Sequence, residues 1–172
     1  MIRLLLGICA VVVVALAGCT AIAVQHDYDP DVDFSTYRSF AWMPLTAQQS
    51  GVPDHLSGPF LHKRIRKALA EELTESGLDY APESADVLVA YQLNYKNKSE
   101  TNADYPHAID VRRYREGTLI IDLVDPDTKA LIWRGWGVSD LHRSTDPQQE
   151  QEQIERAVRK ILARYPPYKQ GA

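Results

Sequence analysis

Residues 117–138 read GTLIIDLVDPDTKALIWRGWGV, two apolar runs on either side of a short polar turn. Both runs are rich in β-branched and aromatic residues, which favour strands. The turn, Asp125-Pro-Asp-Thr-Lys129, contains the residue types that reverse a chain. Two strands joined by so short a turn form an antiparallel hairpin. This hairpin predicts that a β-sheet lies at the centre of the fold.

Three further segments predict strands upstream of the hairpin. Residues 21–28 and 85–95 are largely apolar, and residues 37–43 are rich in aromatic side chains. Residues 96–116 lie between the last of these strands and the hairpin. They are polar with scattered apolar positions, so we expect a long loop with ragged strand ends there.

Two segments have the apolar spacing of amphipathic helices. The first has Ser57 or Gly58 as its cap and Pro59 in its first turn, and Gly77 ends it. Its expected apolar face consists of Leu61, Ile65, Ala68, Leu69 and Leu73.

The second helix begins after Asp146, which is its predicted N-cap, and Pro147 takes the first helical position. It ends before Pro166-Pro167. Its acidic residues come early and its basic residues late, as the helix dipole prefers. Its expected apolar face consists of Ile154, Ala157, Val158, Ile161, Leu162 and Tyr165.

The order of these elements is strand, strand, helix, three strands, helix (ββαβββα). Alternation of this kind favours one mixed or antiparallel sheet of about five strands with both helices on one face. The sequence therefore predicts an α+β fold, a two-layer sandwich.

The amino terminus predicts export. Residues 1–18 carry one charge, Arg3, ahead of an apolar run that is shorter than a membrane-spanning helix and typical of a signal peptide. The residues Leu16-Ala-Gly-Cys19 resemble the lipobox of bacterial lipoproteins. That resemblance implies cleavage before Cys19 and acylation of its thiol and its new amino group. Two or more acyl chains anchor a protein stably to a membrane.

The cysteine count agrees with a lipid anchor at Cys19. The other cysteine, Cys9, leaves with the signal peptide, and a single cysteine in an exported protein needs an explanation. A free or intermolecularly paired thiol is the alternative to lipidation. Thr20 stands where lipoproteins retained in the inner membrane usually have aspartate. By that resemblance we expect the outer membrane of a Gram-negative bacterium, on its periplasmic face.

The expected mature chain is one domain held close to the membrane. Residues 19–24 are the lipidated end and a very short tether, and residues 22–168 form a single periplasmic domain. Such a tether reaches about 20 Å or less. The formal net charge of −4 argues against nucleic acid as a partner, because nucleic acid binds basic surfaces.

Aspartates at positions 27, 29, 31 and 33 alternate in the manner of calcium ligands. The glycine and the bidentate glutamate of a calcium-binding loop are missing at the required spacing. We therefore interpret these aspartates as turn residues that accept hydrogen bonds from nearby backbone.

Motifs for other chemistry are absent from the sequence. The five histidines lack zinc-site spacing, and no nucleophile elbow, phosphate loop or dinucleotide motif occurs. Asp122 and Glu116 are the nearest approach to an acid–base pair, and we interpret them as an edge or outward carboxylate and a loop residue. The sequence predicts no enzyme, no metal and no cofactor.

Residues 62–67, His-Lys-Arg-Ile-Arg-Lys, place cations in the first half of the first helix. Two interpretations are open. The cations lie over membrane phosphates, or they form a solvated face with ion pairs such as Lys67 with Glu71. The second interpretation is favoured.

Trp133, Arg134 and Trp136 share one predicted strand. Alternation places Trp133 on one face and Arg134 with Trp136 on the other. Trp and Arg are the residues that dominate binding energy at protein interfaces. Arg134 and Trp136 are therefore the candidate partner-binding residues if that face is exposed. The alternative is a face covered by residues 96–116.

Taken in order, these segments resemble a bacterial lipoprotein family catalogued as domain of unknown function forty-one thirty-six. The resemblance covers nearly the whole mature chain and implies a lipid-anchored envelope domain with no established chemistry and no catalytic residues. The matching pieces are Asp27-Tyr-Asp-Pro30, Asp33-Phe-Ser-Thr-Tyr37, Phe40-Ala-Trp42, Ala85-Asp-Val-Leu-Val89, Gly117-Thr-Leu-Ile-Ile-Asp122, Leu131-Ile-Trp-Arg-Gly-Trp136 and the closing helix.

The expected function is a non-enzymatic binding or adaptor domain, anchored through Cys19 and contacting an envelope protein near the membrane. A carrier or sensor of a lipid or small apolar ligand is the alternative and needs a cavity between the sheet and the helices. A hydrolase is the third possibility and needs a polar cleft with convergent carboxylates.

Overall fold

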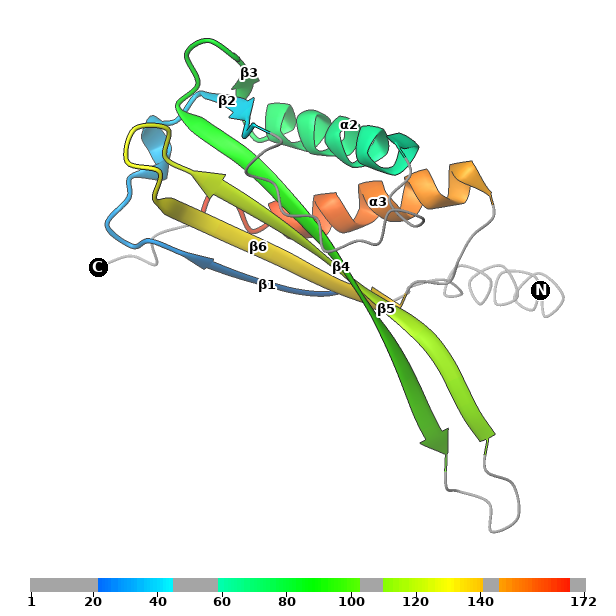
Figure 1. Ribbon diagram of the computed structural model, residues 1–172. Helices are drawn as coiled ribbons and strands as arrows, with labels where there is room; N and C mark the ends of the chain where they lie inside the picture. The colour runs from blue at the N-terminus through cyan, green and yellow to red at the C-terminus, as the bar shows by residue number, and fades with distance from the viewer. Residues whose placement is uncertain (1–21, 45–58, 103–109, 141–145, 168–172) are drawn as a thin grey trace, which may run out of the picture.

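A computed structural model describes residues 22–44, 59–102, 110–140 and 146–167 (Figure 1). Its strands and helices follow the predicted order, with one short strand added after the first α-helix. The elements are β1 (Ala23–Tyr28), the 3₁₀ turn η1 (Phe34–Thr36), β2 (Ser39–Trp42), α2 (Pro59–Glu75), β3 (Asp79–Tyr80), β4 (Val87–Asn102), β5 (Asp110–Val124), β6 (Leu131–Asp140) and α3 (Pro147–Leu162).

The strands form one mixed, six-stranded sheet in the order β1-β6-β5-β4-β2-β3. The pairs β1–β6, β5–β6 and β4–β5 are antiparallel, whereas β2 is parallel to both β3 and β4. The sheet and its hairpin confirm the α+β prediction. The expected count of about five strands was one short, because β3 contains only two residues and shows no apolar alternation.

Both helices lie on one face of the sheet, as predicted (Figure 1). The layer between them is filled by large apolar side chains, among them Trp133, Phe40, Ile65, Leu69 and Leu123, each 1% exposed or less. Ion pairs join the helices, Arg64 with Glu150 and Arg159 Nε with Glu72 Oε1 at 2.9 Å. None of the described helices has the length and apolar character needed to cross a membrane.

The helix ends follow their sequence signals. Asp146 caps α3 by accepting a hydrogen bond from the Gln148 backbone N at 2.9 Å. Gly77 ends α2 with φ of 89°, which lets the Leu78 backbone N donate to the Leu73 carbonyl at 3.0 Å. The predicted caps of α2, Ser57 or Gly58, lie outside the described residues.

The strand β6 carries one extra residue opposite β5. Leu123 pairs with Trp133, but the next residue, Val124, pairs with Leu131, so Ile132 has no partner on β5. This bulge lets Ile132 and Trp133 both join the core, at 3% and 0% exposed, while Leu131 is 45% exposed.

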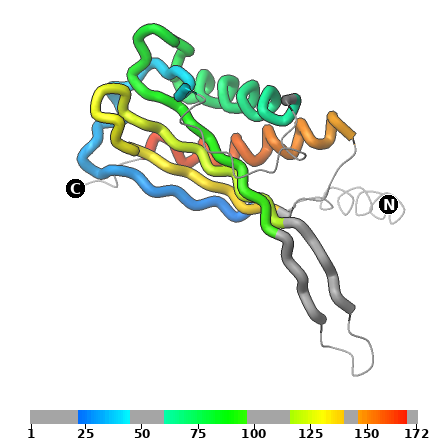
Figure 2. Tube along the Cα trace, in the orientation of Figure 1, coloured from blue at the N-terminus to red at the C-terminus, as the bar shows by residue number. Residues whose placement is uncertain are grey.

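The predicted loop at residues 96–116 was wrong where the structure describes it. Strands β4 and β5 stay paired from Leu88 with Val124 to Asn102 with Asp110. The first β5 residue paired to β6 is Glu116, so residues 97–102 and 110–115 form a two-stranded arm beyond the sheet (Figure 1). Figure 2 traces the sheet from which the arm extends, with α2 and α3 on one side of it. These segments extend beyond the packed sheet and lack the apolar alternation that a buried face imposes, so the sequence pattern misses them.

Candidate functional site

The sheet face opposite the helices carries Arg134 and Trp136. Trp133 lies on the helix face, where its ring meets Tyr165 edge-on at 5.7 Å between centroids. The side chains of Arg134 and Trp136 stand on the other face, since neighbouring strand residues point in opposite directions. This confirms the predicted division of the three residues between two faces. We call the face with Arg134 and Trp136 the open face, because both described helices lie on the other.

Cross-strand pairing brings together residues of four strands around Trp136. Gln25 of β1 and Ile120 of β5 stand on either side of Trp136, and Gln92 of β4 follows Ile120. Directly paired residues share a face and lie about 5 Å apart. Trp136 and Ile120 are both half-buried. The row is an apolar pair flanked by two amides.

The neighbouring row contains an ion pair that the sequence pattern does not reveal. Asp27, Arg134, Asp122 and Ala90 are paired in order across the four strands. Arg134 donates from Nε to Asp122 Oδ1 at 2.6 Å and from Nη2 to Asp122 Oδ2 at 2.7 Å. The Asp122 side chain is 8% exposed and that of Arg134 is 40% exposed. These hydrogen bonds raise the pKa of the Arg134 guanidinium above its usual value.

This two-point contact decides what Asp122 can do. The carboxylate lies on an inner strand and faces outward on the open face, so of the two predicted positions, edge or outward, the second is correct. Arg134 occupies both of its oxygens, so it is not a free acid or base. Glu116 is part of β5 rather than a loop. Glu116 and Asp122 are six positions apart along β5, about 20 Å, which is too far for one catalytic pair.

Small and apolar residues extend the open face beyond the two rows. Val124 is 7% exposed and Ala41 is 6% exposed. Leu131, paired with Val124, is 45% exposed. The open face thus combines apolar side chains with one neutralised ion pair.

Of the four aspartates predicted as turn residues, Asp29 and Asp33 accept hydrogen bonds within their own turn, whereas Asp27 lies in β1. Asp29 Oδ1 accepts from the Asp31 backbone N at 2.9 Å. Asp33 Oδ1 accepts from the backbone N of Ser35 at 3.1 Å and from its Oγ at 2.7 Å. Among the described residues, no three His, Cys, Asp or Glu side chains are grouped to hold a metal ion.

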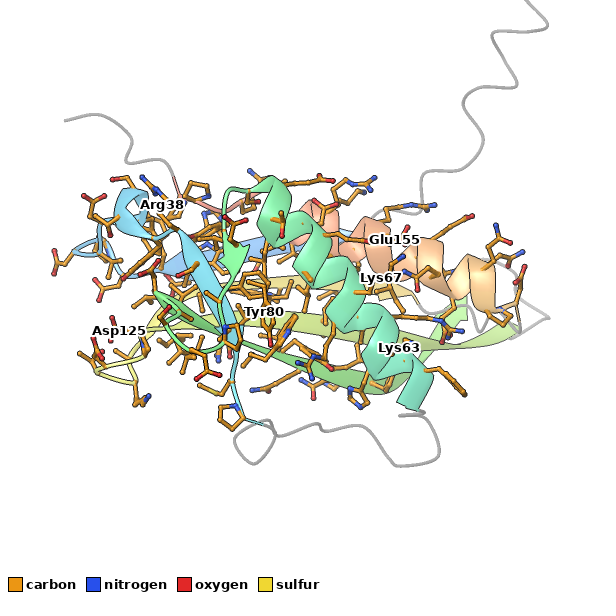
Figure 3. All side chains as sticks on the ribbon, turned by 90° about the horizontal axis from the view of Figure 1, so that it is seen from above. Arg38, Lys63, Lys67, Tyr80, Asp125 and Glu155 are labelled. Atoms are coloured by element: carbon orange, nitrogen blue, oxygen red, sulfur yellow. The ribbon has the colours of Figure 1, made fainter. Side chains whose placement is uncertain are left out.

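The cations of α2 make contacts within the protein. Lys67 Nζ lies 3.5 Å from Glu71 Oε1, which confirms the predicted pair. Arg66 stacks over the Trp42 ring at 4.6 Å, and Arg64 pairs with Glu150 of α3. Lys63 is exposed, and Figure 3 shows it near the amino end of α2. These contacts agree with the solvated-face interpretation.

Cys19 lies outside the described residues, and the first described strand starts four positions later at Ala23.

The described residues define a class of protein, a two-layer α+β domain whose helices cover one face of its sheet. The chain belongs to the family described as Domain of unknown function (DUF4136), which matches residues 24–167. This confirms the family that the sequence resembles, and the family description names neither an activity nor a lipid anchor. No curated protein matches the sequence.

Solved structures with a similar fold share little sequence with this chain. A PDZ domain protein from Parabacteroides distasonis has 16% identity and a TM-score of 0.57 over 88% of this chain, which spans 37% of that structure. A variant of the PelC dodecamer from Paraburkholderia phytofirmans has 14% identity and a TM-score of 0.52, covering 83% of this chain and 95% of PelC. These likenesses support the fold.

Proposed function

We propose that this protein is a lipid-anchored periplasmic domain of a Gram-negative outer membrane, acylated at Cys19, that binds another envelope protein without catalysis. The partner binds the open face around Arg134 and Trp136. The observation that carries the proposal is the Trp136–Ile120 pair beside a neutralised ion pair, on the face away from the helices.

The chemistry of the open face specifies the kind of partner. Asp122 neutralises Arg134, so the centre of the face attracts neither strong acids nor strong bases. Half-buried Trp136 offers a large apolar surface, and Gln25 and Gln92 offer amide donors and acceptors at its border. A protein with an apolar surface edged by hydrogen-bonding groups fits best.

The alternative, a carrier of a lipid or small apolar ligand, is less well supported. Such a carrier needs a space between sheet and helices, and that layer is filled by side chains such as Trp133, Phe40 and Leu69. A hydrolase needs convergent carboxylates, whereas Asp122 is held by Arg134.

The test is crosslinking in living cells with a photoreactive aromatic residue in place of Trp136. We expect one recurrent protein among the adducts by mass spectrometry. The same residue at exposed Glu71 on the helix layer is the control and should not capture that protein. Adducts to lipid alone, or the same proteins from both positions, would contradict the proposal. A second copy of this chain is a separate outcome, since PelC is crystallised as a dodecamer.

Two substitutions separate binding from folding and from anchoring. Trp136→Ala should abolish capture of the partner by the purified protein while circular dichroism still reports a folded domain. If the variant unfolds instead, the Trp136 side chain is required for folding and does not form a separate binding surface. Cys19→Ser should release the protein from the membrane fraction and remove the acyl mass. A Cys19→Ser protein that stays in the membrane fraction and keeps the acyl mass would refute the lipid anchor.

A further inference from the structure

The strand β1 is the edge of the sheet beyond β6, and none of the described strands pairs with its outer side (Figure 1). The Asp29 backbone N donates to the Ile132 carbonyl at 2.9 Å, which continues the β1–β6 register by one residue. Backbone groups alternate in direction along a strand, so the odd-numbered residues of β1 direct theirs toward β6. The backbone N–H and C=O groups of Val24, His26 and Tyr28 therefore point outward, away from the sheet.

One of these outward donors already has a partner within its own chain. The Tyr28 backbone N donates to Asp27 Oδ1 at 2.9 Å. The outward donors that remain are the backbone N–H groups of Val24 and His26. Such a row of edge groups pairs with an added strand. That strand must accept from both donors and must place a suitable side chain beside the exposed Asp27 carboxylate.

The sequence of β1 is complementary to a second copy of itself in antiparallel register. With His26 opposite His26 of the second copy, Val24 lies opposite Tyr28 and Gln25 lies opposite Asp27. The Val24 N–H then meets the Tyr28 carbonyl, and the two His26 residues exchange both of their backbone hydrogen bonds. Val24 packs beside an aromatic ring, and the Gln25 amide donates to the Asp27 carboxylate. A strand of another protein would satisfy the backbone, but a second copy also supplies these matching side chains.

We infer that β1 is the contact between two copies of this chain, which join edge to edge as an antiparallel pair and continue their sheets into one. Such a twofold contact uses the same residues of both copies and therefore closes at the dimer. The odd-numbered residues of β1 stand on the open face beside Arg134 and Trp136, so the two open faces become one surface. The inference depends neither on the lipid anchor nor on the binding of another protein to that face.

The test is disulfide crosslinking of the mature protein as cells make it, with a single cysteine introduced into β1. His26→Cys places the two new cysteines directly opposite each other, about 5.5 Å apart between Cα atoms, which a disulfide can span. Gln25→Cys lies opposite Asp27 of the second copy and is the matched control. After mild oxidation we expect a band of doubled mass for His26→Cys, several-fold stronger than for Gln25→Cys. The unsubstituted protein reports any bridge through Cys19.

Proline tests the backbone pairing separately. His26→Pro removes an outward N–H and keeps the pairing with β6, because proline is tolerated on the outer side of an edge strand. The dissociation constant of the dimer, measured by sedimentation in detergent, should rise about tenfold or more, since both copies lose a hydrogen bond. His26→Ala keeps the N–H and should dimerise like the unsubstituted protein.

Several results would overturn the β1 contact. They are a monomeric unsubstituted protein, equal crosslinking at positions 25 and 26, a bridge from His26→Cys to a different protein, and equal dimerisation of the proline and alanine variants. Circular dichroism checks the fold of His26→Pro, and if that variant is unfolded the crosslinks at positions 25 and 26 decide the question. Loss of acylation or of partner capture would contradict only the proposed function.

Discussion

Arg134 and Asp122 show how a charged pair can stand among apolar side chains on one face of a sheet. The Asp122 carboxylate can be buried there because the Arg134 guanidinium donates to both of its oxygens, at 2.6 and 2.7 Å. Each partner makes the other tolerable there, since a buried charge without a partner is costly. The pair therefore contributes more to keeping the open face in one arrangement than to attracting charged partners.

Arg134→Ala should lower the free energy of unfolding by about 1–3 kcal/mol, because it leaves the Asp122 carboxylate without its donors. Urea unfolding followed by circular dichroism measures this change. The double variant Arg134→Ala, Asp122→Ala should be more stable than Arg134→Ala alone, because the unpaired charge is gone. A double variant that loses the sum of the two single losses would contradict this account.

The face assignment of Arg134 was predictable from sequence, but its partner was not. Alternation along β6 separated Trp133 from Arg134 and Trp136 correctly. If the strands paired without a bulge from Val124 opposite Leu131, Asp122 would lie opposite Trp133. The extra residue Ile132 shifts the register by one and brings Arg134 opposite Asp122 instead. No local signal in the sequence marks that bulge.

At the scale of elements, α3 approaches β6 so closely that the strand needs glycine. An added Cβ on Gly135 would meet the Trp133 ring and would lie 2.6 Å from Ile161 Cγ2. Gly135→Ala should therefore cost about 1–3 kcal/mol of stability, because a packed layer resists extra volume. A thermal or urea titration measures this loss.

Gly137→Ala is the graded control for that prediction. Its added Cβ would lie 3.1 Å from Ile161 Cδ1, at the flexible end of the side chain, so a small rotation relieves it. The loss of stability should be clearly smaller than for Gly135→Ala. Equal losses would mean that strand conformation, and not contact with α3, requires the two glycines.

The elements that the sequence predicted are those that bury one face. Both helices and the central hairpin have apolar residues at a period set by their contact with the core. The arm strands extend beyond the sheet, and their sequence has polar residues at both alternating positions. The two-residue strand β3 is too short to show any period. The chain thus encodes its arm through backbone pairing, which leaves no apolar pattern in the sequence.

At the scale of the whole molecule, Tyr165 joins parts of the chain that are distant in sequence. Its ring packs edge-on against Phe34 of η1 at 5.9 Å and against Trp133 of β6 at 5.7 Å between centroids. Burial raises the pKa of the Tyr165 phenol to about 12, and the nearby Tyr37 adds to the shift. The stability of the protein at alkaline pH therefore depends on the packing of Tyr165 against Phe34 and Trp133.

The unfolded phenol titrates near pH 10, so the raised pKa contributes stability that is complete below pH 10 and is lost as pH rises through about 12. Within that window the protein should lose roughly 1.4 kcal/mol per pH unit through this group. Tyr165→Phe keeps the packing and removes the titration. Its unfolding free energy should fall less steeply above pH 10, and parallel curves for the two proteins would refute the assignment.

The pairing of β1 with β6 has a consequence for the order in which the molecule folds. The first strand of the sheet is completed only by the last one, whereas β4, β5 and β6 follow one another along the chain. Closing so long a loop costs more chain entropy than zipping adjacent hairpins. During synthesis β1 therefore has no strand to pair with until β6 has been made, which is late in the chain. The edge of the sheet formed by β1 is the last to join the cooperative fold.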